Sequence, residues 1–94
     1  MKAGQIQTLH PIAGKTNKKI ALDKYETIRD QLILILQTSE PTHTELMEHL
    51  YQRVKDSFVG GVQWYGETVK LDLEARGIIE RIGAKPERYR LKKG

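Results

Sequence analysis

The chain has 94 residues, with 16 Lys and Arg against 12 Asp and Glu, and it contains no cysteine. This length allows one small domain, and the absence of thiols excludes disulfides, a cysteine nucleophile and a cysteine-ligated zinc site. The longest apolar run covers residues 32–36, far less than the roughly 18 residues of a membrane span, and no apolar stretch follows the first residues as in a signal peptide. We therefore expect a cytoplasmic protein that makes no membrane contact.

The charge is distributed unevenly along the chain. Residues 1–22 carry four lysines and no acid, residues 23–75 carry five bases and ten acids, and residues 76–94 carry seven bases and two acids. Basic ends around an acidic middle are typical of a domain whose termini meet a polyanion. Lysine and arginine also occur on exposed termini simply as solvated residues, so the charge alone leaves both interpretations open.

Residues 1–22 are predicted to form an N-terminal arm or a short edge strand. Residues 5–9 alternate weakly between polar and apolar side chains, and Pro11 excludes a helix through this segment. Gly14, Lys15 and Thr16 match the end of a phosphate-binding loop, but Leu9 stands where that motif needs its first glycine. Nucleotide hydrolysis is therefore not expected.

The first helix is predicted to begin with Asp23 as its N-cap, supported by Glu26 three residues later, and to end before Ser39. Its apolar residues recur at steps of three and four and predict one buried stripe. The stripe consists of Tyr25, Ile28, Leu32, Ile35 and Leu36.

Two further helices follow. Thr42 and Glu45 form a capping box that predicts a helix to about Lys55, and a third helix is expected over residues 63–76, ending at Gly77. Their expected buried residues are Leu46, Met47, Leu50 and Val54 in the second helix, and Trp64, Tyr65, Val69 and Leu73 in the third.

After Gly77 the apolar period changes from helical to two, which predicts a β-hairpin. The strands are expected over residues 78–82 and 88–92, with a turn at 83–87. Tyr89 and Leu91 would lie on one face of the second strand, and three basic residues on the other. The order predicts a mainly α domain over residues 23–94 with a small hairpin, preceded by the arm.

The C-terminal half resembles a known fold. Leu73-Glu74-Ala75-Arg76-Gly77-Ile78-Ile79-Glu80-Arg81, followed by Arg88-Tyr89-Arg90-Leu91, resembles the recognition helix and wing of winged helix-turn-helix regulators of bacteria. Residues 64–77 and 8–15 are also similar to a small bacterial winged-helix family that has no established activity. The resemblance implies a winged helix-turn-helix, three helices plus a wing. The segment between Leu50 and Trp64 is longer than the usual short turn of that motif.

The resemblance implies double-stranded DNA as the partner of a small transcription regulator, with residues 63–76 in the major groove and the hairpin on the backbone. The candidate DNA-binding residues are Gln63, Glu67, Thr68, Lys70, Arg81, Lys85, Arg88, Arg90 and Lys92. Gln and Thr can hydrogen-bond to bases, and the cations can contact phosphates.

The alternative is a module for protein interaction or homodimerisation, because residues 63–76 carry three acids against two bases. A positive stripe through Lys18, Lys19, Lys70, Arg81 and Arg88 would favour DNA. An exposed Leu71 would favour a protein partner, as would an exposed Trp64 or Tyr65, although we expect both aromatic residues to be in the core.

No residues predict catalysis. Ser39 and Ser57 lie in linkers without a nucleophile motif, and Glu45 and His49 are best interpreted as a surface pair rather than metal ligands. We therefore expect no enzyme activity, no metal, no cofactor and no small-molecule substrate.

Overall fold

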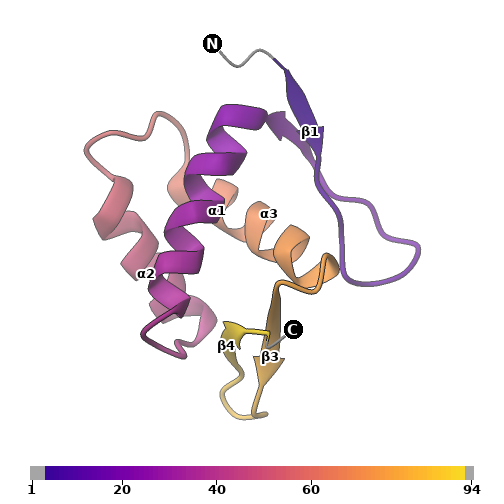
Figure 1. The fold of residues 1–94 in the computed structure, drawn as a ribbon, viewed down its shortest axis with the longest axis vertical. Helices are drawn as coiled ribbons and strands as arrows, with labels where there is room; N and C mark the ends of the chain where they lie inside the picture. Colours follow the sequence, from indigo (N-terminus) through magenta and orange to yellow (C-terminus); the bar gives the residue numbers. More distant parts are fainter. Residues whose placement is uncertain (1–3, 93–94) are drawn as a thin grey trace.

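The computed structural model describes residues 4–92, so residues 1–3 of the predicted arm and residues 93–94 lie outside it. The elements in chain order are β1 (Gln5–Gln7), β2 (Lys19–Ala21), α1 (Leu22–Leu36), α2 (His43–Val54), α3 (Val62–Ala75), β3 (Ile79–Ile82) and β4 (Arg88–Leu91) (Figure 1). β1 pairs with β2 and β3 with β4, both antiparallel, and the two small sheets lie toward opposite ends of the molecule (Figure 1). The prediction of three helices and a C-terminal hairpin is confirmed.

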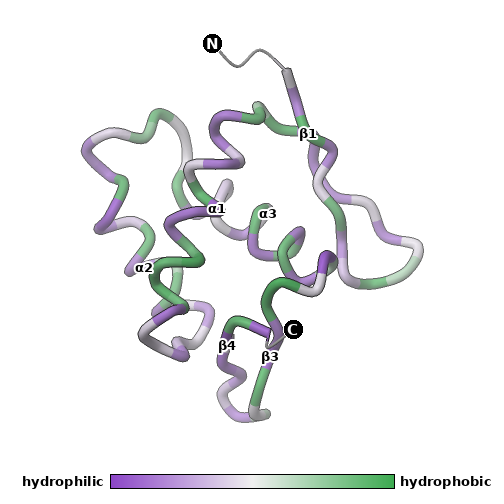
Figure 2. The backbone as a smooth tube through the Cα atoms, viewed as in Figure 1, coloured by the Kyte–Doolittle hydropathy of each residue, from purple (hydrophilic) through white to green (hydrophobic). Residues whose placement is uncertain are grey.

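The core lies where the three helices meet. α1 contacts both α2 and α3, and the whole predicted stripe of α1 is buried. Leu50 of α2 and Leu73 of α3 are fully buried against it, and burial of a leucine side chain contributes about 1.5–3 kcal/mol. Gly66 lets α2 and α3 approach closely, because a Cβ there would lie 2.7 Å from Leu50 Cδ2. Hydrophobic and hydrophilic residues alternate along each helix, in keeping with one buried face (Figure 2).

Local capping determines two of the helix ends as predicted. The Thr42–Glu45 capping box is present at the start of α2, where Glu45 N donates to Thr42 Oγ1 and Thr42 N donates to Glu45 Oε1. Gly77 follows α3 with a φ of 75°, the left-handed conformation that glycine adopts without strain.

The start of α1 differs from the prediction. The helix begins at Leu22, its N-cap is Ala21, and no side chain caps it. Asp23 instead accepts a hydrogen bond from the backbone of its neighbour Lys24. The reason is that β2 runs directly into α1, so the extended residue before the helix is the last residue of a strand.

The arm is part of a two-stranded sheet. Gln5 pairs with Ala21 and Gln7 with Lys19, and Ile20 is buried in the core as expected. The sequence predicted β1 as a strand or an extended arm but did not identify β2 as its partner. Three residues in each strand carry too short an alternation to specify their pairing.

A buried carboxylate attaches the arm to the helices. Asp72 on α3 is fully buried and accepts hydrogen bonds from Leu9 N at 2.8 Å and Arg76 Nε at 2.8 Å. The hydroxyl of Tyr25 on α1 also donates to it. One carboxylate therefore connects the arm, α1 and α3, and its negative charge is matched by hydrogen-bond donors as burial requires.

The hairpin packs against the helices through one face. Its register pairs Ile79 with Leu91 and Arg81 with Tyr89, and both Ile79 and Tyr89 are buried. On the other side of β4, Thr42 forms an isolated bridge with Arg88, and Tyr89 N donates to Pro41 O at 2.9 Å. The segment 41–42 thus lies beside β4, and β4 lies between it and β3.

Replacement of Asp72 by alanine should lower the free energy of unfolding by on the order of 3 kcal/mol, because it leaves buried donors without an acceptor. Urea denaturation followed by circular dichroism measures this. Asp30→Ala is the matched control, since Asp30 is exposed and, within residues 4–92, its carboxylate pairs with Arg29 alone. A loss below about 1 kcal/mol for Asp72→Ala would contradict the assigned role.

Tyr25 should be the last tyrosine to ionise. Burial, with the hydrogen bond to Asp72, raises its pKa from 10.0 to about 12. Because the folded pKa is raised, the neutral hydroxyl stabilises the fold fully below pH 10.0, and this stabilisation is lost as the pH rises toward 12. Titration of tyrosinate absorbance should show this late step in the native protein and not in Tyr25→Phe. A late step that persists in the variant would belong to another tyrosine.

Candidate nucleic-acid interface

The predicted contact residues of α3 are divided between its surface and the interior. Gln63 and Glu67 are exposed, as predicted. Thr68 and Lys70 are 5% and 4% exposed, so the expectation that they lie on the exposed part of the helix is wrong.

Both buried side chains are covered by neighbouring elements. Asn17 of the arm lies over Thr68 and donates from Nδ2 to its carbonyl oxygen at 3.0 Å. Lys70 lies under the hairpin, where its Nζ donates to the Tyr89 hydroxyl at 3.0 Å and lies 3.7 Å from Glu74 Oε1. The helical period of the sequence predicts Lys70 on an exposed face of the helix. That face is covered because the hairpin packs against it.

The five predicted cations of the hairpin do not form one surface. Arg81 is opposite Tyr89 in the register, on the face turned to α3, and its Nε donates to Glu74 Oε2 at 2.7 Å. This hydrogen bond raises the pKa of Arg81. Arg88 and Arg90 pair with Ile82 and Glu80, which lie on the opposite face. A strand alternates its side chains, so residues 81 and 88 of this hairpin point away from each other.

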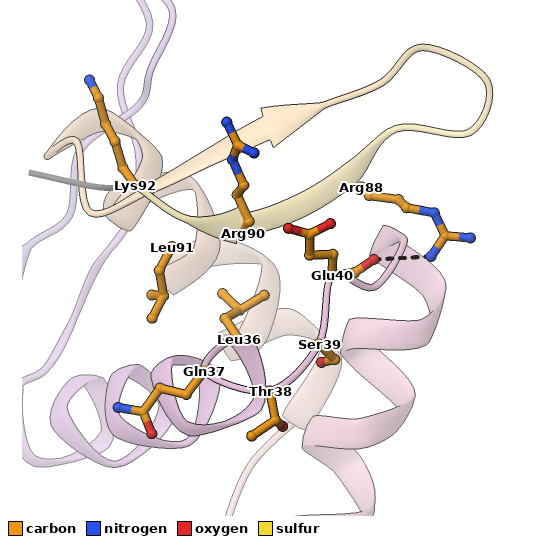
Figure 3. A pocket seen from close by; sticks show the side chains of 9 residues that line it. All are labelled: Leu36, Gln37, Thr38, Ser39, Glu40, Arg88, Arg90, Leu91 and Lys92. Carbon is orange, nitrogen blue, oxygen red and sulfur yellow. Dashed lines mark hydrogen bonds between the residues drawn. The ribbon is translucent and has the colours of Figure 1, made fainter.

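A groove of about 880 Å³ lies between β4 and the end of α1, with Leu91 of the strand pointing toward Leu36 of the helix (Figure 3). Arg88, Arg90 and Lys92 line it from the strand, and Gln37 to Glu40 line it from the helix end. Arg88 Nη1 donates to Glu40 O at 3.0 Å, and Arg90 Nε donates to Glu80 Oε2 at 2.7 Å. Both arginines are therefore already neutralised or hydrogen-bonded within the chain.

The lysines have fewer partners. In the part of the chain that the structure describes, the ammonium groups of Lys85 and Lys92 make no hydrogen bond or ion pair, and the same holds for Lys18 and Lys19 of the arm. The arm lysines were not among the candidate contact residues, although Lys18 and Lys19 belonged to the positive stripe that would favour DNA. The charge distribution was the signal for them, because residues 4–22 contain no acid.

The exposed strip of α3 differs from the predicted one. Trp64 is 49% exposed, so its expected place in the core is wrong, and Tyr65 is half-buried, with its ring centroid 5.1 Å from that of Phe58. Trp64, Glu67 and the half-buried Leu71 follow each other at steps of three and four residues and share one face. This spacing, with a carboxylate in its middle, was a signal that the face is not part of the core.

The arm borders this strip along its length, and the hairpin contacts α3 next to it. Trp64, Glu67 and Leu71 line a hollow of about 210 Å³ together with Lys18 of the arm. One turn further along the helix, Glu74 binds Arg81 of β3. The continuous line of cations from Lys18 to Arg88 that would favour DNA is not present, because Lys70 is buried in the middle of it. Cations remain on both sides of the exposed strip of α3.

Within residues 4–92, no group of three His, Asp or Glu side chains is arranged to hold a metal ion. None of the described helices combines the length and the apolar character needed to cross a membrane.

His43 lies beside Tyr89, the residue that accepts a hydrogen bond from Lys70, and the centroids of the His43 and Tyr89 rings are 6.5 Å apart. Burial, and then the charge of Lys70, lowers its pKa below 6.5. Because the folded pKa is depressed, this residue favours the fold above pH 6.5 and destabilises it as the pH falls through the folded value.

Lys70→Met should raise the pKa of His43 because it removes a neighbouring positive charge while retaining most of the side-chain volume. NMR titration of the imidazole protons measures the change, with the exposed His49 as an internal control. An unchanged pKa of His43 would show that Lys70 does not act on it electrostatically.

The comparisons with known proteins identify a family but no activity. Neither the curated proteins nor the solved structures include a match to this sequence. A family of unknown function, DUF6958, matches residues 5–89, which cover the arm, the three helices and most of the hairpin. The chain belongs to this family.

Proposed function

We propose that this chain is a winged-helix DNA-binding protein that acts as a small transcription regulator. The order of elements supports the fold assignment, because α1, the extended segment 41–42, α2 and α3 precede a hairpin whose second strand lies between segment 41–42 and β3. In such an arrangement α3 is the helix that enters the major groove and the hairpin is the wing.

The observation that carries the proposal is the position of the exposed α3 strip between two sets of cations. Lys18 of the arm lies beside the strip on one side, with Lys19 next to it in the chain, and the hairpin with Lys85 in its turn lies on the other side. Arg81 of the hairpin is already paired with Glu74 and Glu87. Double-stranded DNA presents a phosphate every few ångströms on both sides of a groove, so cations on both flanks of a helix can contact both strands.

The strip itself has little positive charge. Lys70 is buried, and Gln63 and Glu67 are the exposed polar residues of the first two turns. Glutamine can bond to adenine, and glutamate can accept a hydrogen bond from cytosine, but neither neutralises phosphate. The proposed affinity therefore comes from the flanking lysines, and it should depend strongly on salt.

Arg88, Arg90 and Lys92 have a secondary place in this proposal. They lie on the hairpin face turned away from Arg81, and the two arginines already bond to groups of the chain. Lys85, in the turn, is the hairpin cation best placed to contact a backbone phosphate, because its ammonium group has no partner among the described residues.

The second candidate function, protein interaction, is favoured by one observation, the exposed indole of Trp64. Large exposed aromatic side chains are typical of protein interfaces. Protein binding at Trp64 does not by itself explain Lys19 and Lys85, whose ammonium groups have no partner among the described residues.

Fluorescence-anisotropy titration of a mixed-sequence DNA duplex at several salt concentrations tests the proposal. Lys18→Ala/Lys19→Ala should reduce the slope of log affinity against log salt by about two, and Lys85→Ala should reduce it by about one, since each lysine releases about one counterion. The control is Lys55→Ala, which removes an equally exposed lysine after α2.

Two results would overturn the proposal. One is the absence of binding near physiological salt. The other is an equal effect of Lys55→Ala and Lys85→Ala, which would show that only the net charge matters and that no particular face of the protein meets DNA.

A further inference from the structure

The exposed indole of Trp64 forms a ridge between two hollows of different character. On one side a hollow of about 430 Å³ lies between α2 and α3, lined by Glu48, Tyr51, Gly61, Val62, Gln63 and Trp64. On the other side lies the hollow that contains Lys18 and Leu71. Trp64 is the one residue that lines both hollows, so its indole separates them.

The centre of this surface is apolar. Tyr51 is 45% exposed and Trp64 49%, and both are among the large hydrophobic side chains that the described structure leaves open to solvent. Aromatic residues in such a position dominate the binding free energy of many protein interfaces. Val62 forms the floor of the first hollow and is itself buried, so an inserted ring would meet an apolar surface.

The two sides of the ridge carry opposite charges. Glu48 lies at the first hollow, and among the described residues its carboxylate accepts a hydrogen bond only from Gln52 Nε2, at 2.8 Å. Lys18 lies at the second, and its ammonium group has no partner within residues 4–92. A twofold rotation about an axis near Trp64 would bring Lys18 of one copy to Glu48 of the other, and the reverse. The surface is therefore complementary to itself, which is what a symmetric dimer requires.

We infer that the Trp64 surface binds a second copy of this chain. In the dimer each indole enters the hollow between α2 and α3 of the other copy, and the ion pair of Lys18 with Glu48 forms twice. Glu67 also lines the hollow that contains Lys18, so Lys18 has a second carboxylate near it. Neutralising Lys18 would therefore not show that it pairs with Glu48. Exchanging the two residues, Lys18 for glutamate and Glu48 for lysine, does test this pair.

The dimer covers Trp64 and the strip of α3 that the proposed function places on DNA, so self-association and DNA would compete for the same helix. The dimer is measured without DNA, however, and its presence does not depend on the proposed function. A failure of DNA binding and a failure of dimerisation are therefore observed in separate experiments.

Sedimentation velocity over a range of protein concentrations tests the inference. The native chain should form a reversible dimer, and Trp64→Ala should raise the dissociation constant at least about tenfold, as the loss of a central aromatic residue does in other interfaces. The matched control is Leu34→Ala, which removes a similarly exposed apolar side chain, 44% exposed, from α1. Circular dichroism verifies that each variant is folded.

The exchange of charges tests the symmetry. Glu48→Lys alone and Lys18→Glu alone should each weaken the dimer about twofold to fivefold, because like charges then face each other across the axis. The double variant Glu48→Lys/Lys18→Glu should restore the native dissociation constant, since each chain again offers both signs.

Three results would overturn the inference. The first is a monomer at all concentrations. The second is a dimer that Trp64→Ala leaves unchanged or that Leu34→Ala weakens equally. The third is a double variant whose dimer has a higher dissociation constant than the dimers of both single variants. A symmetric pairing of residues 18 and 48 cannot give that result.

Discussion

The carboxylate of Asp72 is the interaction on which the arrangement of this small protein depends. It is fully buried on α3 and accepts hydrogen bonds from the arm at Leu9, from Tyr25 on α1 and from Arg76. A charge in the interior is tolerated only when donors surround it, so these elements are held at one point. The arm consequently lies along α3, and its lysines become neighbours of the exposed helix face.

Lys70 shows the same principle with the opposite charge. Its side chain extends under the hairpin to the Tyr89 hydroxyl and lies near Glu74, which in turn binds Arg81. These contacts connect α3 to β3 and β4, and they remove from the surface the one cation that the exposed strip would otherwise have carried. The face of α3 is left with an amide, a carboxylate and an indole, while the cations lie beside it on the arm and the hairpin.

Local signals accounted for most of the secondary structure. The steps of three and four in α1, the capping box at Thr42 and the glycine after α3 act over a few residues, and each appears where it was expected. The change of period after Gly77 also produces the predicted strand, which begins at Ile79, one residue later than expected. The errors occurred where a distant segment decides the outcome. Ala21 replaces Asp23 as the N-cap because β2 pairs with β1, and that pairing joins residues that the sequence separates by a loop.

The candidate interface also depends partly on local signals in the sequence and partly on contacts between distant segments. The sequence by itself determined the number and order of the helices, the C-terminal hairpin, and the concentration of positive charge at both ends of the chain, because composition and period are local properties. Only the tertiary structure decided which of these residues can meet a partner. Burial of Lys70 and Thr68, exposure of Trp64 and the separation of Arg81 from Arg88 follow from how the arm and the hairpin dock on α3. No helical period contains that information, because a face of a helix is open or closed according to what packs against it.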